Sequence, residues 1–176
     1  MVSGSSEGLL LVAMSGLPGV GKSELARHLA RKLPISLIEL DRIEGPLLQQ
    51  GISGDSIAWA GYEILTALAE DNLEIGRSVL LDSVCWTRAI RERWATLAAK
   101  YHARYRPIEV VCSDAALHRR RVESRDGSSR SLHNINWLRV EEARSLYEAW
   151  DRSRLVLDSV QPVRLLLIDA LDYARS

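Results

Sequence analysis

The fold of this chain is decided by one stretch of its sequence, Gly16-Leu17-Pro18-Gly19-Val20-Gly21-Lys22-Ser23. The stretch fits the pattern G-x-x-x-x-G-K-[ST] of the phosphate-binding P-loop. An apolar run at residues 9–14 precedes it, as expected of a buried parallel strand, and Leu25, Leu29 and Leu33 follow it at helical spacing. Strand, glycine-rich loop and helix in this order are the context that the motif requires.

The residue types in this loop suit a bound nucleotide. Glycines at positions 16, 19 and 21 can adopt positive φ and let the backbone approach a phosphate closely. The amides of residues 19–23 then lie at the start of a helix, where the helix dipole favours an anion. Lys22 supplies a charge for the β- and γ-phosphates, and the Ser23 hydroxyl suits Mg²⁺. We therefore expect residues 16–23 to bind ATP with Mg²⁺; a glycine turn capped by Ser23 is the alternative.

Length and composition indicate one globular domain. The chain has 176 residues, of which we expect 1–8 to form a flexible terminus and 9–176 a single domain. Lysine plus arginine and aspartate plus glutamate balance at 23 each, so nothing in the net charge favours nucleic acid or a membrane as a partner. No signal peptide and no membrane-spanning run is evident. Cys85 and Cys112 lie in apolar stretches, as expected of reduced thiols in a cytoplasmic protein.

Strand and helix patterns alternate along the chain, which predicts a parallel α/β sheet. The expected class is a three-layer P-loop NTPase fold, with a five-stranded parallel sheet flanked by helices and a small lid. The predicted strands are residues 9–15, 35–41, 78–83, 108–112 and 163–168. After the P-loop helix, the predicted helices lie near residues 55–71, 87–101, 114–125 and 137–151.

Two of the predicted strands end in a carboxylate, at the edge of the sheet where such folds bind their ligands. Asp82 ends an apolar strand in the Walker B manner, so we expect it to position Mg²⁺ together with Ser23. Asp41 ends the second strand and could accept a proton from an attacking hydroxyl. Asp82 could instead cap the next turn, and Asp41 could be a cap or a surface carboxylate facing Arg42.

A cluster of arginines precedes a segment with the composition of a loop. Arg121 and Arg125 lie one helical turn apart and could contact ATP and stabilise the transferring phosphoryl group. Residues 126–136 would then form a lid loop that closes over the nucleotide. The alternatives are a solvated basic helix face, or the same roles filled by other arginines of the cluster, Arg119, Arg120 and Arg130. No known nucleic-acid-binding motif accompanies this patch.

The region between the second and third strands, residues 44–76, is predicted to be helical and to bind the acceptor. Trp59 and Tyr62 are three residues apart in it and are candidates for a substrate pocket wall, although aromatics at helical spacing usually belong to the core. The histidines show no metal-ligand spacing, and we interpret them as surface or edge residues: His28, His102, His118 and His133.

Elimination narrows the class of P-loop protein. The chain contains no Asn-Lys-x-Asp and no Asp-x-x-Gly, which disfavours Ras-type and translation GTPases. Ser83 follows Asp82, where many P-loop ATPases carry a glutamate that activates water. With its P-loop, Asp41, Leu-Leu-Asp at 80–82 and Arg121-x-x-x-Arg125, the chain resembles the AAA-type ATP-binding kinase-like family. That family is related to chloramphenicol phosphotransferase, gluconate kinase, polynucleotide kinase and the zeta toxins.

The resemblance implies a role for each matching residue. Lys22 and Ser23 would bind phosphate and Mg²⁺, Asp41 would be the base toward the acceptor hydroxyl, and Arg121 and Arg125 would be lid arginines. Arg88 would reach the acceptor or its phosphate.

The leading hypothesis is therefore an ATP-dependent phosphotransferase acting on a hydroxyl of a small molecule or nucleoside-like acceptor. The alternatives are a nucleotide-binding regulatory ATPase without a small acceptor and a zeta-toxin-like kinase of a nucleotide-sugar. The sequence leaves the acceptor open, and it favours neither a monomer nor a dimer.

Overall fold

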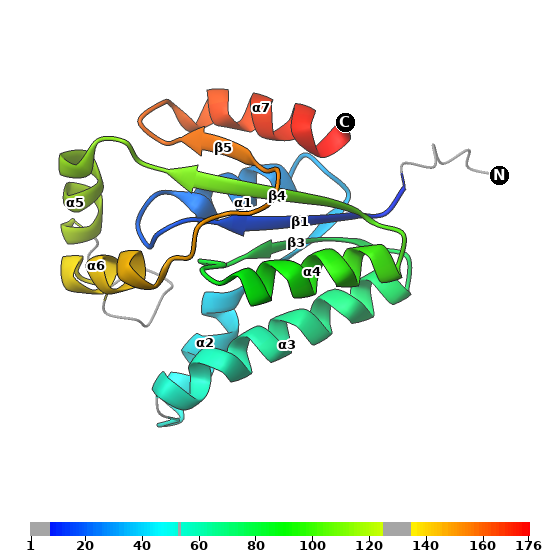
Figure 1. The fold of residues 1–176 in the computed structure, drawn as a ribbon, viewed down its shortest axis with the longest axis horizontal. Helices are drawn as coiled ribbons and strands as arrows, with labels where there is room; N and C mark the ends of the chain where they lie inside the picture. Colours follow the sequence, from blue (N-terminus) through cyan, green and yellow to red (C-terminus); the bar gives the residue numbers. More distant parts are fainter. Residues whose placement is uncertain (1–7, 53, 125–134) are drawn as a thin grey trace.

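The computed structural model describes residues 8–52, 54–124 and 135–176. Within them, five parallel strands form one sheet in the order β2-β3-β1-β4-β5 (Figure 1). The strands are β1 (Leu10–Ser15), β2 (Ile35–Glu39), β3 (Ser78–Asp82), β4 (Arg104–Val111) and β5 (Leu155–Asp158). All six residues of β1 are buried, because this strand is central and pairs with β3 on one side and β4 on the other. The predicted α/β class and five-stranded sheet are confirmed.

Helices cover both faces of the sheet and make it the middle of three layers (Figure 1). Successive side chains of a strand point to opposite faces, so β1 contributes Val12 and Met14 to one core and Leu11 and Ala13 to the other. The first core lies under α1 (Lys22–Ala30) and α7 (Val163–Arg175). The second lies under α3 (Gly54–Glu74) and α4 (Arg88–Lys100).

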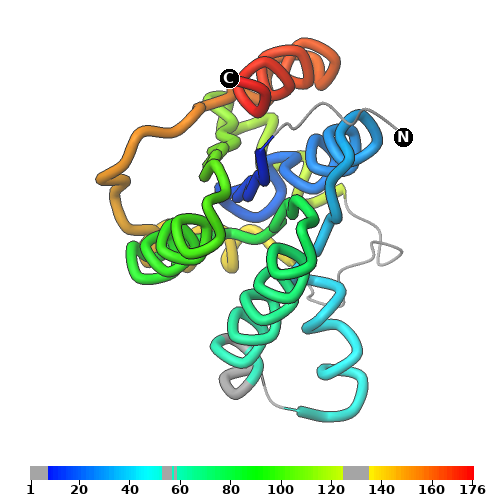
Figure 2. The backbone as a smooth tube through the Cα atoms, turned by 90° about the vertical axis from the view of Figure 1, so that its right-hand side faces the viewer, coloured from blue at the N-terminus to red at the C-terminus, as the bar shows by residue number. Residues whose placement is uncertain are grey.

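The three remaining helices of the described residues lie at or beyond the carboxyl edge of the sheet. The helix α2 (Leu40–Gln49) packs on α3, and the two extend side by side away from the sheet (Figure 2). At the opposite end of that edge, α5 (Ala115–Glu123) packs on α6 (Trp137–Leu146). Parallel strands open their ligand sites at their carboxyl ends, so α2, α5 and α6 surround the place where a ligand is expected.

The predicted fifth strand, residues 163–168, is wrong. These residues form the first turns of α7, and the fifth strand is Leu155–Asp158. An apolar run of this length reads equally well as a buried strand. The discriminating pattern lies further on, because Leu166, Ala170 and Ala174 recur at i, i+4 and i+8 and are all buried. Pro162 precedes the helix, at a position where a missing N–H does no harm.

Other boundaries also differ from the predictions. The fourth strand begins at Arg104, four residues before the predicted start, and it accommodates Pro107. The second strand ends at Glu39, so Asp41 lies in the first turn of α2 and not at the end of a strand. Within the described ranges, no helix is long and apolar enough to cross a bilayer.

Two tryptophans make the stability of the second core testable. Trp94 is fully buried, and its Nε1 donates to Thr66 Oγ1 at 3.0 Å, whereas Trp59 is 58% exposed. We expect Trp94→Ala to lower the free energy of unfolding by roughly 3–5 kcal/mol, because a large cavity remains and the Thr66 hydroxyl, which still donates to Tyr62 O, loses the donor that it accepts from. Trp59→Ala should change it by less than about 0.5 kcal/mol. Urea unfolding of both variants measures this, and equal losses would show that the core is placed wrongly.

Candidate active site

The P-loop is held in place by its first glycine. Gly16 N–H donates to Val84 O at 3.2 Å, and Gly16 has a φ of 126°. A Cβ at this position would lie 2.1 Å from Val110 O. Only glycine can therefore occupy the turn, because any side chain would collide with the backbone of β4 and would also be strained at this φ. The loop consequently leaves the central strand in contact with β4 on one side and with the chain that follows β3 on the other.

Lys22 and Ser23, the last residues of the motif, begin helix α1. Lys22 is 8% exposed, and its Nζ donates to Leu17 O at 2.9 Å, so its charge lies inside the loop. The charge of Lys22 and the hydroxyl of Ser23 are both close enough to lower the pKa of Asp82. The P-loop cation and hydroxyl thus meet the carboxylate at the end of β3.

Asp82 is a buried carboxylate that could accept a further hydrogen bond or bind a metal ion. It is 5% exposed, and its Oδ1 has no hydrogen-bond partner among the described residues. Burial raises the pKa of Asp82 to about 6, against the lowering effect of Lys22 and Ser23; the negative charges of Asp41 and Glu39 raise it further. An orphaned carboxylate oxygen beside a hydroxyl is the oxygen-rich chemistry that Mg²⁺ prefers, so these residues fit the metal.

The described residues hold no cluster of three or more His, Cys, Asp or Glu side chains of the kind that forms a metal cage. Mg²⁺ in phosphoryl-transfer sites is usually held by one or two protein groups together with substrate phosphates and water. Ser23 and Asp82 would supply such groups.

Strand pairing brings Asp41 to the same place. Glu39 at the end of β2 pairs in register with Asp82 at the end of β3, so the chain that leaves β2 passes beside Asp82. Asp41 follows within the first turn of α2, is half-buried, and is close enough to affect the pKa of Asp82. Arg42 is exposed and lies 3.9 Å from Glu39 Oε2. The predicted Lys22, Ser23, Asp41 and Asp82 therefore lie at one edge of the sheet.

Arg121 is held by the turn that follows β5. Its Nη1 donates to Ser159 Oγ and its Nη2 to Ser159 O, both at 2.9 Å. Ser159 follows β5, and a Cβ on Gly21 would lie 4.0 Å from the Ser159 Cβ. Arg121 thus lies near the amino end of α1 and is anchored to the turn after β5. Arg125 and most of the predicted lid, residues 126–136, fall outside the described residues.

The candidate acceptor residues do not form one pocket wall. Trp59 is exposed on α3, while Tyr62 is 7% exposed in the second core, where its hydroxyl accepts from Cys85 N–H at 3.2 Å. Tyr62 therefore supports the chain after β3 from beneath. Arg88 is at the start of α4, and its Nε donates to Ala149 O at 3.3 Å.

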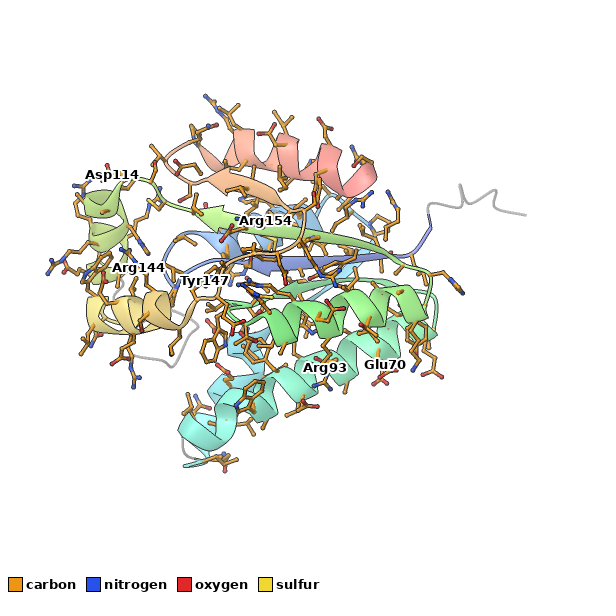
Figure 3. All side chains as sticks on the ribbon, in the orientation of Figure 1. Glu70, Arg93, Asp114, Arg144, Tyr147 and Arg154 are labelled. Carbon is orange, nitrogen blue, oxygen red and sulfur yellow. The ribbon has the colours of Figure 1, made fainter. Side chains whose placement is uncertain are left out.

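A cavity of about 310 Å³ adjoins the P-loop on the side of β4, and sequence reasoning missed its polar residues. Glu109 Oε1 accepts from the Tyr147 hydroxyl at 2.9 Å, and Glu109 Oε2 accepts from Arg154 Nε at 2.5 Å. Arg144 also lines the cavity; Figure 3 shows Arg144 on α6 and Tyr147 near the carboxyl end of that helix. Its further lining comes from Gly16, Leu17, Val20, Val110, Val111, Cys112 and His118. Tyr147 gave no functional signal in the sequence because its helical spacing is typical of core aromatics.

Arg91 joins the wall of this cavity to the chain after β3. Its side chain is fully buried and donates to four backbone carbonyls, those of Cys85, Trp86, Glu148 and Ala149. The guanidinium also lies 4.1 Å from the Trp150 ring centroid and 5.0 Å from that of Tyr147. A buried cation satisfied in this way fixes the segment that follows α6.

Comparisons with known proteins agree with this architecture. A protein-family model described as an AAA domain matches residues 11–150. An unliganded sugar kinase from Janibacter sp. HTCC2649 is 21% identical, with a TM-score of 0.71 and 94% of each chain covered. A gluconokinase from Sinorhizobium meliloti 1021 is 18% identical, with a TM-score of 0.67 over 94% of this chain and 91% of that one. Kti12 from Chaetomium thermophilum, solved with ADP-AlF3, is 19% identical, with a TM-score of 0.67 over 93% and 98%. At these low identities, the structural similarity shows a shared fold.

The raised pKa of Asp82 predicts a pH-dependent effect of replacing it. Because the folded-state pKa, about 6, exceeds the ordinary value of 3.8, ionised Asp82 destabilises the fold at pH values above it. Asp82→Asn should therefore be more stable than the wild type at pH 8, by an amount on the order of 3 kcal/mol. The difference should fall to roughly half at pH 5, where the folded carboxyl is mostly protonated.

Urea unfolding in EDTA at the two pH values measures this difference without a metal. A difference in the free energy of unfolding that is the same at both pH values would contradict the burial of this charge. A wild type more stable than Asp82→Asn at pH 8 would contradict it as well.

Proposed function

The chain belongs to the AAA domain family, and from that premise we propose that it is an ATP-dependent phosphotransferase. It would move the γ-phosphate of Mg-ATP to a hydroxyl of a small-molecule or nucleoside-like acceptor. The observation that carries this proposal is the meeting of Lys22, Ser23, Asp82 and Asp41 at one edge of the sheet. The first three groups suit a metal-bound triphosphate, and the fourth is a carboxylate with no evident role in holding it.

The triphosphate would lie on the amides at the start of α1. Lys22 would turn from Leu17 O to the β- and γ-phosphates, which are stronger acceptors for an ammonium group. The nucleoside would extend toward the turn after β5, where Arg121 presents a planar guanidinium held by Ser159. Ser23 and Asp82 would hold Mg²⁺, which when bound neutralises charge on the β- and γ-phosphates.

Asp41 is proposed as the base. The acceptor hydroxyl would give its proton to the Asp41 carboxylate as its oxygen bonds to the γ-phosphorus, and the bond from that phosphorus to the β–γ bridging oxygen would break and release ADP. Lys22 would stabilise the negative charge on the transferring group, because it lies inside the loop and away from bulk water.

The cavity beside the P-loop is proposed to hold the non-reacting part of the acceptor. Its volume of about 310 Å³ is at the lower end of the range for small-ligand sites. It reaches Gly16 and Leu17 on the P-loop, and it presents the carboxylate of Glu109 and the hydroxyl of Tyr147. Groups of this kind orient a polar acceptor by hydrogen bonds. Roles for Arg42, Trp59 and Arg88 toward the acceptor stay predictions.

Removing the P-loop charge should weaken nucleotide binding and slow turnover. We expect Lys22→Ala to weaken ATP binding by at least tenfold and to reduce turnover by at least about a hundredfold, because the buried ammonium is lost from the phosphate site. Calorimetric titration with Mg-ATP and an assay of ADP release measure the two effects. Lys32→Ala, at an exposed position beyond α1, is the matched control. Unchanged binding in Lys22→Ala would place ATP elsewhere.

Replacing the proposed base should separate binding from transfer. Asp41→Asn should keep the affinity for Mg-ATP within about threefold while lowering the transfer rate by roughly 10²–10⁴, because the amide cannot accept the proton. The same two assays apply, with Asp169→Asn on α7 as an exposed control. A transfer rate within a factor of a few of the wild type would remove Asp41 from the chemistry.

A further inference from the structure

His118 is buried against the P-loop, although its sequence context predicted a surface or edge residue. It lies on α5, is 2% exposed, and its Nε2 is 2.8 Å from Pro18 O, a hundred residues away in the chain. A histidine that reaches a backbone carbonyl of the phosphate-binding loop constrains that loop directly.

The chemistry of the contact determines which nitrogen carries the hydrogen. A carbonyl oxygen only accepts, so Nε2 must donate to Pro18 O. Burial lowers the pKa of His118, which favours the neutral ring with its hydrogen on Nε2. The donor is present in both the neutral and the charged ring, so the contact persists across the physiological pH range.

The contact fixes one peptide plane of the loop. The peptide between Pro18 and Gly19 is trans, and in a planar trans peptide the C=O and N–H point in opposite directions. With the Pro18 carbonyl held toward α5, the Gly19 N–H points to the other side of the loop. Residues 19–23 are the ones whose amides are expected to bind phosphate there.

The surroundings of His118 leave this arrangement little freedom. A Cβ on Gly19 would lie 2.4 Å from Val122 Cγ2 and 3.4 Å from His118 Nε2, so α5 lies directly against the loop. On its other side, the His118 ring packs edge-to-face on Trp137 of α6, with centroids 5.2 Å apart and planes at 78°. The imidazole is thus clamped between the P-loop and α6.

We propose that His118 is a positioning residue for nucleotide binding, which holds the Pro18–Gly19 peptide with its N–H toward the phosphates. This role rests on the proposed ATP site and adds a determinant outside the P-loop motif. Without the donor from His118, the peptide can rotate and present its carbonyl to the phosphates, which repels them. Because His118 acts on the loop and not on the acceptor, its loss should weaken binding of phosphate chains with or without a nucleoside.

The test compares His118→Leu, which lacks a donor, with His118→Gln, whose amide nitrogen can occupy the place of Nε2. Calorimetry measures the dissociation constants of Mg-ADP and of inorganic tripolyphosphate. His118→Leu should bind both roughly tenfold more weakly than the wild type. This is the factor expected when the hydrogen bond from the Gly19 N–H to a charged phosphate oxygen is lost. His118→Gln should bind both within about threefold of the wild type. Glu123→Gln, at an exposed position on α5, is the control and should leave binding unchanged.

Thermal melting confirms that each variant is folded, and His118→Met replaces the leucine variant if that one is not. Wild-type affinity in folded His118→Leu or His118→Met would overturn the inference alone. Equal weakening in His118→Gln would also overturn it, because a loss of packing then explains the effect. A wild type that binds neither Mg-ADP nor tripolyphosphate would overturn the proposed ATP site itself.

Discussion

The close approach of the P-loop to strand β4 at Gly16 is the constraint on which the rest of the structure depends. The missing side chain lets the loop turn over Val110 O, and the Gly16 N–H then joins the loop to Val84 beyond β3. The start of the loop is therefore fixed between β4 and the chain that follows β3. Everything proposed for the site is placed relative to that point.

Charged side chains are concentrated beside the P-loop, at the carboxyl edge of the sheet. Lys22 and Asp82 are both buried at the carboxyl edge of the sheet, and Asp41 enters the same electrostatic neighbourhood from α2. Burying ionised groups is costly unless they are paired or meet a ligand, and Asp82 has one oxygen with no described partner. Such an arrangement lowers the free energy of unfolding, so it is more typical of a functional site than of a structural one, and it suits the proposed metal-bound triphosphate.

Supporting contacts come from residues that are distant from the P-loop in the sequence. His118 holds the outer side of the P-loop, and Arg91 ties the segment after α6 to the chain after β3. Both side chains are almost fully buried, and both donate to backbone carbonyls. A hydrogen bond to a backbone carbonyl fixes the path of the backbone directly. These two residues can therefore hold the cavity and the loop in a constant geometry.

Local patterns predicted much of the fold. The strands β1 and β3 could be predicted because buried parallel strands are continuous apolar runs. The grouping of Ser23, Asp41 and Asp82 follows from the rule that parallel strands open their ligand sites at one edge. The apolar run of α7 was mistaken for a strand, because a short run carries no period that separates the two. Glu109, Tyr147 and His118 could not be found, because their meeting with the P-loop depends on how α5 and α6 pack and leaves no spacing in the sequence.

The most direct test of phosphotransfer is the dependence of ADP release on the acceptor. The wild-type protein with Mg-ATP is assayed across a panel of polyols, sugars, sugar acids and nucleosides, and against no acceptor. The account predicts that one chemical class raises ADP release by about a hundredfold or more and gains a phosphate in equal amount. An ADP release rate that is the same with every acceptor and with none would contradict it, and would show an ATPase in place of a kinase.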